Sequence, residues 1–304
     1  MAERQGKLGD MWNACAVRFL SLFDWNHIGD KDIDVIGEDG NAYGIDALMD
    51  YNSPGMATRQ SVIVESKRYS KDSINYSVMS GWLRRLTKKL EQCRNSEELQ
   101  NEFPALMECC SINLGVILVW VHDAENEEYF HSDFTRLLNR LVSVTRAKPN
   151  AFKRIIVLTN PQILRLCALY VTLKDCDYAF VYPSQLIGNY ALERSKVLTI
   201  DYMLSNVILT EIKKDGATEK HVFYFGIMTV EAIKILRESL LKYQFAENDK
   251  KLVIHYTQHN DGTADLIHEF EKQFTDVSSV SFKKMSKFNL TAEPSIISNE
   301  DEKI

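Results

Sequence analysis

Two short segments of the sequence place acidic and basic side chains where they could act together in hydrolysis. The first is Gly44-Ile45-Asp46, and the second is Val62-Ile63-Val64-Glu65-Ser66-Lys67. On a β-strand, residues two apart project from the same face, so Glu65 and Lys67 share a face. If the chain between the segments turns about Gly55 and Met56, antiparallel pairing places Asp46 opposite Glu65, with Cβ atoms about 5 Å apart. Two carboxylates this close repel each other, and a shared divalent cation would compensate for the repulsion.

Such a site would suit the hydrolysis of a phosphodiester bond. Mg²⁺ typically binds proteins through one or two carboxylates, together with waters and phosphate oxygens, and Mn²⁺ is expected to substitute for it. A bound metal lowers the pKa of a water ligand and neutralises charge on the phosphate, while a lysine orients the water or stabilises the transition state. We therefore expect Asp46 and Glu65 to be metal ligands and Asp46, Glu65 and Lys67 to be catalytic. The alternative is a structural ion-pair cluster at a strand end.

The surrounding sequence predicts a mixed α/β sheet to position these residues. Apolar residues at helical spacing predict a first helix over residues 10–23 and a long one over residues 77–103. Between them, turn signals and β-branched residues predict a hairpin and a third strand. The hairpin is expected over residues 31–37 and 42–51, and the third strand over residues 61–67. Later strands are expected over residues 115–121 and 154–158, with a helix between them over residues 134–144. This alternation of helices and strands is typical of the α/β class.

These residues and this order of elements resemble the PD-(D/E)xK superfamily, the restriction-endonuclease-like nucleases. The Gly-Ile-Asp spelling and the continuation Lys67-Arg68-Tyr69 look most like the Mrr-type branch. The resemblance covers residues 10 to about 121. It implies a restriction-endonuclease-like mixed sheet flanked by helices, with Asp46 and Glu65 as metal ligands and Lys67 as the catalytic lysine. Many relatives carry a glutamate near the start of the first helix, where this chain has Trp12-Asn13. The resemblance therefore supplies no further ligand from that helix.

The charge distribution indicates where nucleic acid would bind. The net charge is −6, yet the segment from Arg59 to Arg94 has nine basic residues against three acidic ones, so the rest of the chain carries −12. Because salt limits exposed charges to a reach of about 8 Å, one basic face can attract phosphate on an acidic protein. A solvated helix face is the alternative. The residues predicted to contact nucleic acid are Arg68, Tyr69, Lys71, Arg84, Arg85, Lys88 and Lys89.

A second Glu-x-Lys tripeptide provides an internal control. Glu211-Ile212-Lys213 follows Asp201, but Asp215-Gly216 and another strand come next, where the superfamily core needs a helix. We therefore expect no catalysis there. Two further possibilities are weaker: Asp32 and Asp34 as additional metal ligands on what is otherwise a solvated strand edge, and His255 with His259 as a zinc pair.

The second half of the chain predicts a smaller α/β domain. Its expected elements are a helix over residues 164–173, a strand over 178–182, a hairpin over 207–213 and 221–225, a helix over 230–243, a strand over 251–256 and a helix over 264–274. The pattern is irregular around residues 183–194. We therefore predict a nuclease domain over residues 1–190, a smaller partner-docking or sensor domain over 191–285, and a disordered tail over 286–304.

The composition limits where and how such a protein acts. The chain has 304 residues, of which 45% are apolar and 26% charged, as in globular proteins. No apolar run reaches the roughly 18–20 residues that a membrane span needs, and the first residues lack the apolar core of a signal peptide. We therefore expect a cytoplasmic protein without membrane contact.

Taken together, these features predict a Mg²⁺-dependent endonuclease acting on double-stranded DNA, by family association in bacterial restriction or antiviral defence. Cutting both strands generally needs two active sites, so a homodimer or a hetero-oligomer with a partner protein is expected. One alternative is a catalytically inactive nuclease-like scaffold that binds nucleic acid or a partner subunit. Another is a sensor that responds to a nucleotide through residues 200–284.

Overall fold

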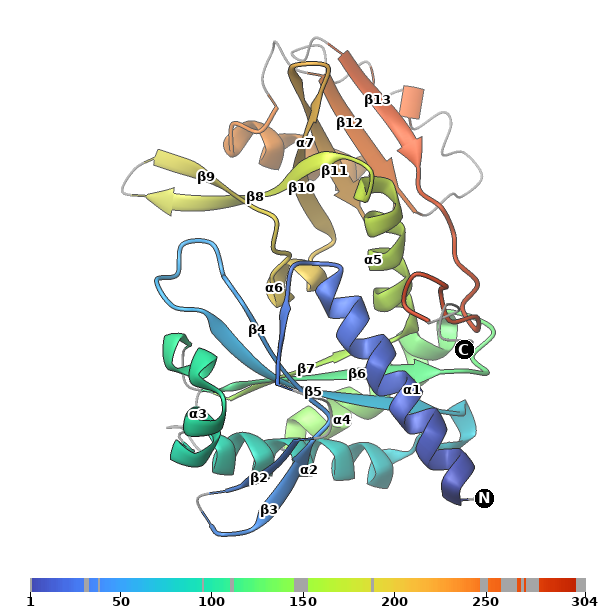
Figure 1. Ribbon diagram of the computed structural model, residues 1–304. Helices are drawn as coiled ribbons and strands as arrows, with labels where there is room; N and C mark the ends of the chain where they lie inside the picture. The colour runs from blue at the N-terminus through green and yellow to red at the C-terminus, as the bar shows by residue number, and fades with distance from the viewer. Residues whose placement is uncertain are drawn as a thin grey trace. The chain divides into compact units, whose positions relative to one another are not determined.

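The computed structural model describes most of the chain, in two compact units (Figure 1). Unit 1 consists of Met1–Leu164 with Phe288–Ile304, and unit 2 of Arg165–Lys287. The described residues are 2–29, 33–37, 39–94, 96–109, 112–144, 153–186, 189–246, 251–257, 267–268, 271 and 279–298. No helix in these ranges is both long enough and apolar enough to cross a membrane.

Unit 1 is built on a mixed sheet, which confirms the predicted α/β class. Its strand order is β1-β4-β5-β6-β7, in which β1, β4 and β5 are antiparallel neighbours and β5, β6 and β7 are parallel. Every residue of β6 is buried, as expected for a central strand covered on both faces. The strands are β1 Asn26–Ile28, β4 Ala47–Tyr51, β5 Gln60–Tyr69, β6 Leu114–Val121 and β7 Arg154–Leu158.

The prediction of one hairpin arm over residues 42–51 is wrong, because this segment forms two separate strands, β3 and β4. β3 (Ala42–Ile45) pairs with β2 (Ile33–Ile36) in a separate two-stranded sheet, whereas β4 pairs with β1 and β5. The reason lies in burial: all residues of β4 are buried, while β3 is exposed at alternate positions. The chain changes sheets at Asp46.

Helices cover both faces of the unit 1 sheet. α1 (Ala2–Ser21) lies on one face, where the Trp12 indole N–H donates to the Leu118 carbonyl at 3.3 Å. α2 (Tyr76–Cys93) lies on the other, and its Leu86 and Leu90 join a core with Ile117 and other sheet residues. The remaining elements are α3 Glu97–Glu102, α4 Thr135–Val144, the 3-10 turns Lys71–Ser73 and Pro104–Glu108 and the π-turn Phe130–Phe134.

The long helix predicted over residues 77–103 is interrupted. α2 ends at Cys93, and a new helix, α3, starts after Ser96. The Ser96 side chain accepts a hydrogen bond from the Leu99 backbone N–H at 3.2 Å. A serine that caps a helix N-terminus in this way offers the backbone an alternative to continuing the preceding helix.

Unit 2 contains its own sheet and core. Its strand order is β13-β12-β11-β10-β8-β9, in which β11, β12 and β13 are parallel and the others antiparallel. α7 packs Ile233, Leu236 and Leu240 against one sheet face. The strands are β8 Asp177–Leu186, β9 Asn189–Ser195, β10 Val207–Lys214, β11 Ala217–Tyr224, β12 Lys251–Tyr256 and β13 Ser279–Lys284, and the helices are α5 Asn160–Leu173, α6 Ile200–Leu204 and α7 Val230–Lys242.

Three features of the second half differ from the sequence pattern or lie outside the described residues. Residues 183–186 and 189–194 are not irregular, because β8 and β9 form an antiparallel pair that includes Pro183. Pro183 is tolerated because it lies past Val181, the last residue of β8 that also pairs with β10. The predicted helix over residues 264–274 lies largely outside the described residues. Residues 299–304, at the end of the predicted tail, lie wholly outside them. Within the predicted tail, Ile297 is buried and the Leu290 carbonyl accepts a hydrogen bond from Asn160 at 2.8 Å.

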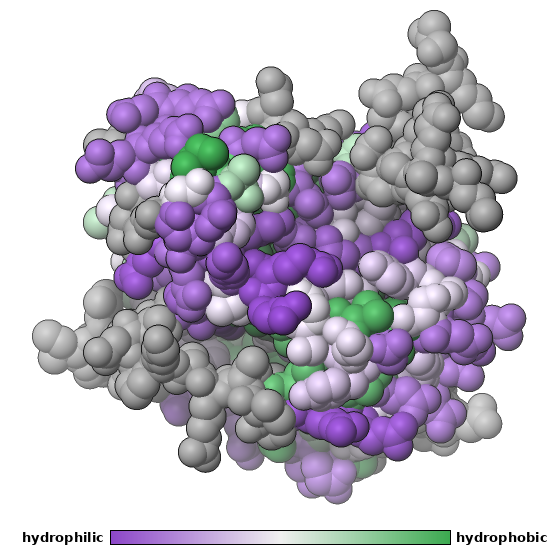
Figure 2. Space-filling model, turned by 90° about the horizontal axis from the view of Figure 1, so that it is seen from below, coloured by the Kyte–Doolittle hydropathy of each residue, from purple (hydrophilic) through white to green (hydrophobic). Residues whose placement is uncertain are grey.

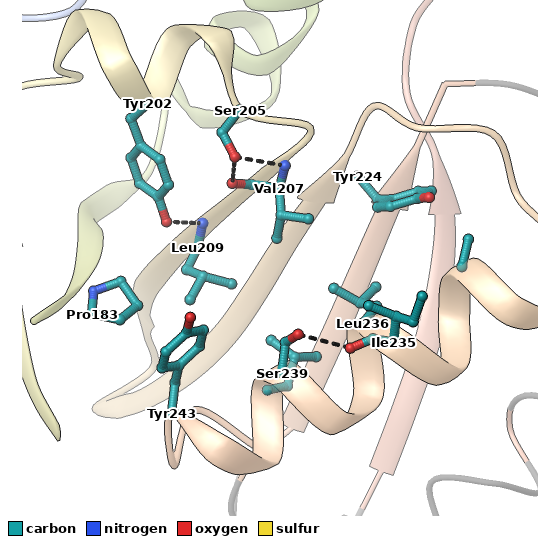
Figure 3. A pocket seen from close by; sticks show the side chains of 12 residues that line it. Pro183, Tyr202, Ser205, Val207, Leu209, Tyr224, Ile235, Leu236, Ser239 and Tyr243 are labelled. Carbon is teal, nitrogen blue, oxygen red and sulfur yellow. Dashed lines mark hydrogen bonds between the residues drawn. The ribbon is translucent and has the colours of Figure 1, made fainter. Parts of the chain in front are cut away.

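Unit 2 also contains an apolar pocket of about 510 Å³ (Figure 3). Side chains from α6, β10, β11 and α7 line it, among them Tyr202, Leu209, Leu236 and Tyr243. The Tyr202 hydroxyl is bound to backbone at two points, since it donates to the Val181 carbonyl at 2.8 Å and accepts from the Leu209 N–H at 2.7 Å. The pocket therefore offers mainly apolar contacts.

Candidate active site

The three residues predicted to be catalytic meet on the sheet of unit 1. Asp46 lies where the chain passes from β3 to β4, and Glu65 and Lys67 lie on β5. The Lys67 ammonium is 2.7 Å from Glu65 Oε2 and 3.4 Å from Asp46 Oδ2. The β4–β5 register pairs Ala47 with Val64, and one further step along both strands places Asp46 opposite Glu65. This is the geometry that the sequence predicts.

Local structure fixes the orientation of Asp46. Its Oδ2 atom accepts a hydrogen bond from the Ser66 backbone N–H at 3.1 Å, which ties it to the middle of the Glu-x-Lys tripeptide. The Ser66 side chain projects from the opposite face of β5, because neighbouring strand residues alternate. There its hydroxyl bonds to Asn13 of α1. The first helix therefore supports β5 from behind, on the face opposite to Glu65 and Lys67.

A fourth residue, Lys89 of α2, belongs to the same cluster. Its ammonium forms an ion pair with Glu65 Oε1, and its side chain is only 13% exposed. The sequence pattern predicts nucleic-acid contact for Lys89, together with its neighbours, and does not predict this contact with Glu65. A signal for it existed, because Lys89 is seven residues after Trp82 and three after Leu86, and so falls on the helix stripe that faces the core.

The electrostatics of the cluster keep its charges in place. Burial alone would raise the pKa of Glu65, but the ammonium groups of Lys67 and Lys89 outweigh burial and hold that pKa below its usual value. Burial would lower the pKa of Lys67, but Glu65 and Asp46 raise it above the ordinary value. Lys67 is therefore a cation at neutral pH. It is suited to stabilise negative charge or orient water, and not to accept a proton.

The donor set fits a divalent cation. Asp46 and Glu65 each place an oxygen atom in contact with the same ammonium nitrogen, so their carboxylates already converge on one positive charge. Carboxylate oxygens are the ligands that Mg²⁺ and Mn²⁺ prefer. In the described ranges, no group of three or more histidine, cysteine, aspartate or glutamate side chains could hold a metal. The protein would thus supply two carboxylate ligands. Water molecules and phosphate oxygens would supply the remaining ligands.

The other residues predicted to contact nucleic acid lie in different surroundings. On α2, Arg84 and Arg85 are exposed, and Lys88 is exposed beside Asp39 at 3.5 Å. Figure 2, seen from the side on which α2 and the β2–β3 hairpin lie in Figure 1, shows a mostly hydrophilic surface.

Arg68 and Tyr69, which follow Lys67 on β5, make side-chain contacts within unit 1. The Arg68 guanidinium pairs with Glu293 at 2.7 Å, and the Tyr69 ring packs on Trp82 with centroids 5.0 Å apart. Lys71 is exposed, and its backbone N–H donates to Asp123. Of the predicted set, Arg84, Arg85 and Lys71 are the exposed basic residues of unit 1 for which no ion pair is seen among the described residues.

Among the described residues, the weaker candidates form no group of three or more side chains that could hold a metal. Asp34 is exposed on β2, in the two-stranded sheet, and Asp32 lies outside the described residues. His255 is hydrogen-bonded to His221 at 2.9 Å in unit 2, and His259 lies outside the described residues. In the second Glu-x-Lys segment, Glu211 pairs with Arg194 and Lys213 with Asp177.

A mixed sheet flanked by helices, with an acid before one strand and Glu-x-Lys on the next, defines a PD-(D/E)XK nuclease. Comparison with protein families identifies which one: residues 1–162 match the GAPS4 protein PD-(D/E)XK nuclease domain, and the chain belongs to that family. The predicted superfamily is thereby confirmed, whereas the likeness to the Mrr-type branch stays a prediction.

The other comparisons add little. No curated protein gives a significant match. Among solved structures, an Argonaute from A. aeolicus aligns over 85% of this chain with 12% identity and a TM-score of 0.19. The chain spans 39% of the length of that Argonaute.

Proposed function

We propose that this protein is a divalent-metal-dependent endonuclease that hydrolyses phosphodiester bonds in DNA. The observation that carries the proposal is the convergence of Asp46 and Glu65 on the Lys67 ammonium, at 3.4 and 2.7 Å, within a domain of a nuclease family. Two carboxylates this close repel each other, and the chain places the ammonium groups of Lys67 and Lys89 beside them to offset that repulsion. A metal site for phosphate chemistry accounts for that arrangement.

In this proposal each residue has a distinct part. Asp46 and Glu65 would hold Mg²⁺ or Mn²⁺, which when bound supplies Lewis-acid stabilisation of the phosphate and a water of lowered pKa. Lys67, kept protonated by its two acidic neighbours, would orient the attacking water or stabilise the negative charge that develops on the phosphate. Arg84 and Arg85, exposed on α2, would bind backbone phosphates and position the duplex without reading its sequence.

Double-stranded DNA is the proposed substrate, in restriction or antiviral defence. Cutting both strands calls for two active sites, so we expect a second copy of the chain or a partner subunit. We assign docking of that partner, or sensing of a ligand, to unit 2. The apolar pocket lined by Leu209, Leu236 and Tyr243 supports this assignment because it gives unit 2 a concave apolar surface. Light scattering of the purified chain, with and without DNA, would give the stoichiometry.

Cleavage of plasmid DNA tests the central proposal. Supercoiled plasmid is incubated with the full chain and Mg²⁺ or Mn²⁺, with and without a chelator, beside Lys67→Ala and Glu65→Gln. We expect metal-dependent nicking or linearisation by the wild type and its loss in both variants, while DNA binding by gel shift persists. Cleavage that continues in chelator, or in both variants, would refute the assigned site.

The alternative is an inactive nuclease-like scaffold that binds nucleic acid or a partner. The ion pairs of Glu65 with Lys67 and Lys89 are compatible with it, because they balance the buried carboxylate without a metal. The same experiment separates the two. DNA binding without cleavage by any version of the protein, in either metal and with its partner present, would favour the scaffold.

A further inference from the structure

The carboxylate of Glu65 is engaged on both oxygen atoms by lysines from two different elements. Oε2 lies 2.7 Å from Lys67 Nζ on the same strand, and Oε1 pairs with Lys89 Nζ from α2. All three side chains are largely shielded from water, with exposed fractions of 6% for Glu65, 15% for Lys67 and 13% for Lys89. Ion pairs shielded in this way are screened much less than pairs on the surface.

The charges in the cluster balance without any added ion. Asp46 and Glu65 contribute two negative charges, and Lys67 and Lys89 contribute two positive ones. A divalent cation arriving alone would have to share Glu65 with two ammonium groups and would leave the cluster with an excess of two positive charges. A nucleic-acid phosphate that arrives with the cation reduces this excess.

The position of Lys89 on α2 lets its ammonium group compete directly with a metal ion for the Glu65 carboxylate. It sits on the core-facing stripe of α2, between the buried residues Leu86 and Leu90, so the helix directs its side chain at the sheet. Lys88, the next residue along the helix, is 54% exposed and lies by Asp39. The two lysines have the same charge and differ in whether they touch Glu65.

From this geometry we infer that Lys89 is a positioning residue that acts as an internal cation on Glu65, so that the site takes up a divalent metal tightly only together with nucleic acid. The inference rests on the proposed function, because it assumes that Glu65 is a metal ligand. Lys89 holds the buried carboxylate in place in the free enzyme and releases its oxygen atom when metal and phosphate enter together. The free enzyme would then hold little metal. Cleavage would begin only when a phosphodiester is correctly placed in the site.

Direct measurement of Mn²⁺ binding tests the inference without an activity assay. Mn²⁺ is titrated into the full chain, without DNA, and bound ion is followed by electron paramagnetic resonance or calorimetry. Lys89→Met, which keeps the length of the apolar stem, is expected to bind Mn²⁺ at least about tenfold more tightly than the wild type, since a competing positive charge is removed. Lys88→Met is the matched control and is expected to bind like the wild type.

The possible outcomes point in opposite directions. If Lys89 only supports the fold of the site, Lys89→Met binds Mn²⁺ as weakly as the wild type or more weakly, which overturns the inference. If Lys88→Met tightens binding as much as Lys89→Met, net charge and not contact with Glu65 is responsible, which also overturns it. Lys89→Arg, which keeps the charge, is expected to stay as weak as the wild type.

The wild-type protein provides a second test that needs no variant of Lys89 to fold. A short DNA duplex is expected to raise the affinity of the wild type for Mn²⁺ at least about tenfold, after subtraction of the Mn²⁺ bound by duplex alone. Equal affinity with and without duplex would overturn the inference. A chain that binds Mn²⁺ in this coupled way but cuts no plasmid would leave the inference standing and refute the proposed nuclease activity, so the two failures are distinguishable.

Discussion

The chain contains the tripeptide Glu-x-Lys on two strands, and the two copies have different surroundings. Glu65 of β5 is buried, with Lys67 at 2.7 Å, and Lys67 reaches a second carboxylate, Asp46. Glu211 of β10 is also nearly buried, but two nitrogen atoms of Arg194 bind its two oxygen atoms, at 2.6 and 3.0 Å. Lys213 lies by Asp177 at 3.8 Å, and both are exposed.

The residue on the neighbouring strand makes the difference. Asp46 falls opposite Glu65, so acid meets acid and the pair requires cations. The cross-strand partner of Glu211 is the basic residue Lys220, and its carboxylate is bound by the Arg194 guanidinium, so no second carboxylate faces it on β11. The same tripeptide therefore faces a second carboxylate in unit 1, where we propose a metal site, and forms an ion pair with Arg194 in unit 2. Its chemistry is set by what lies opposite it.

The strongest test of this comparison is to remove the lysine from each copy. Lys67→Ala is expected to lower plasmid cleavage by about 100-fold or more, because it removes a preorganised cation from the reacting phosphate. Lys213→Ala removes the same side chain from the second copy and is expected to leave cleavage rates unchanged. Initial rates at saturating Mg²⁺ measure both. Equal losses in the two variants would mean that the second copy is also functional, and the comparison would fail.

Removing the glutamate of the second copy should affect stability and not cleavage. Glu211→Gln leaves the Arg194 guanidinium without its charged partner, and we expect the free energy of unfolding of unit 2 to fall by about 1–2 kcal/mol. Differential scanning calorimetry would detect the lower melting temperature. Cleavage per folded molecule should equal that of the wild type. A variant that melts normally but no longer cuts DNA would contradict the structural role of Glu211.

The sequence predicted that Asp46, Glu65 and Lys67 lie together because the signals for this arrangement are local. Strand alternation puts Glu65 and Lys67 on one face, and the turn near Gly55, which adopts a φ of 75°, sets the register that brings Asp46 opposite. Lys89 was missed because its contact depends on how α2 packs against β5, which is a tertiary property. The break between β3 and β4 was missed for the same kind of reason, because only burial distinguishes an arm of a hairpin from a strand of the main sheet.

The two units should also respond differently to acid. The pKa of Glu65 lies below its ordinary value of 4.5 because of the ammonium groups of Lys67 and Lys89, so its contribution to stability is present above pH 4.5 and is lost only as the pH falls through the lowered pKa. In unit 2, burial lowers the pKa of His221 to about 4 and that of His255 to about 3, although Glu219 opposes the shift at His221 and the positive charge of Lys283 adds to both. Their contribution is complete above the ordinary value of 6.5 and is lost as the pH falls from there towards 4.

Hydrogen exchange at several pH values would test this difference. Between pH 6.5 and pH 4.5, amides of β11 and β12 in unit 2 are expected to lose protection, while those of β5 and β6 in unit 1 keep it, after correction for the intrinsic pH dependence of exchange. The double variant His221→Gln, His255→Gln should flatten the response of unit 2, because neither replacement titrates. Equal loss of protection in both units would show that these histidines do not set the acid sensitivity of unit 2.

The smallest expected effect compares one helix from each unit. On α2, the double variant Arg84→Ala, Arg85→Ala removes two exposed cations near the first Glu-x-Lys segment, and on α7 the variant Lys234→Ala, Lys242→Ala removes two exposed cations from unit 2. If Arg84 and Arg85 each contact a phosphate, the slope of log affinity for DNA against log salt concentration should become shallower by about 2, with a several-fold weaker affinity at physiological salt. The α7 variant has the same change in net charge and should leave the slope unchanged. Fluorescence anisotropy over a salt series measures both, and equal slopes for the two variants would place the DNA elsewhere on the protein.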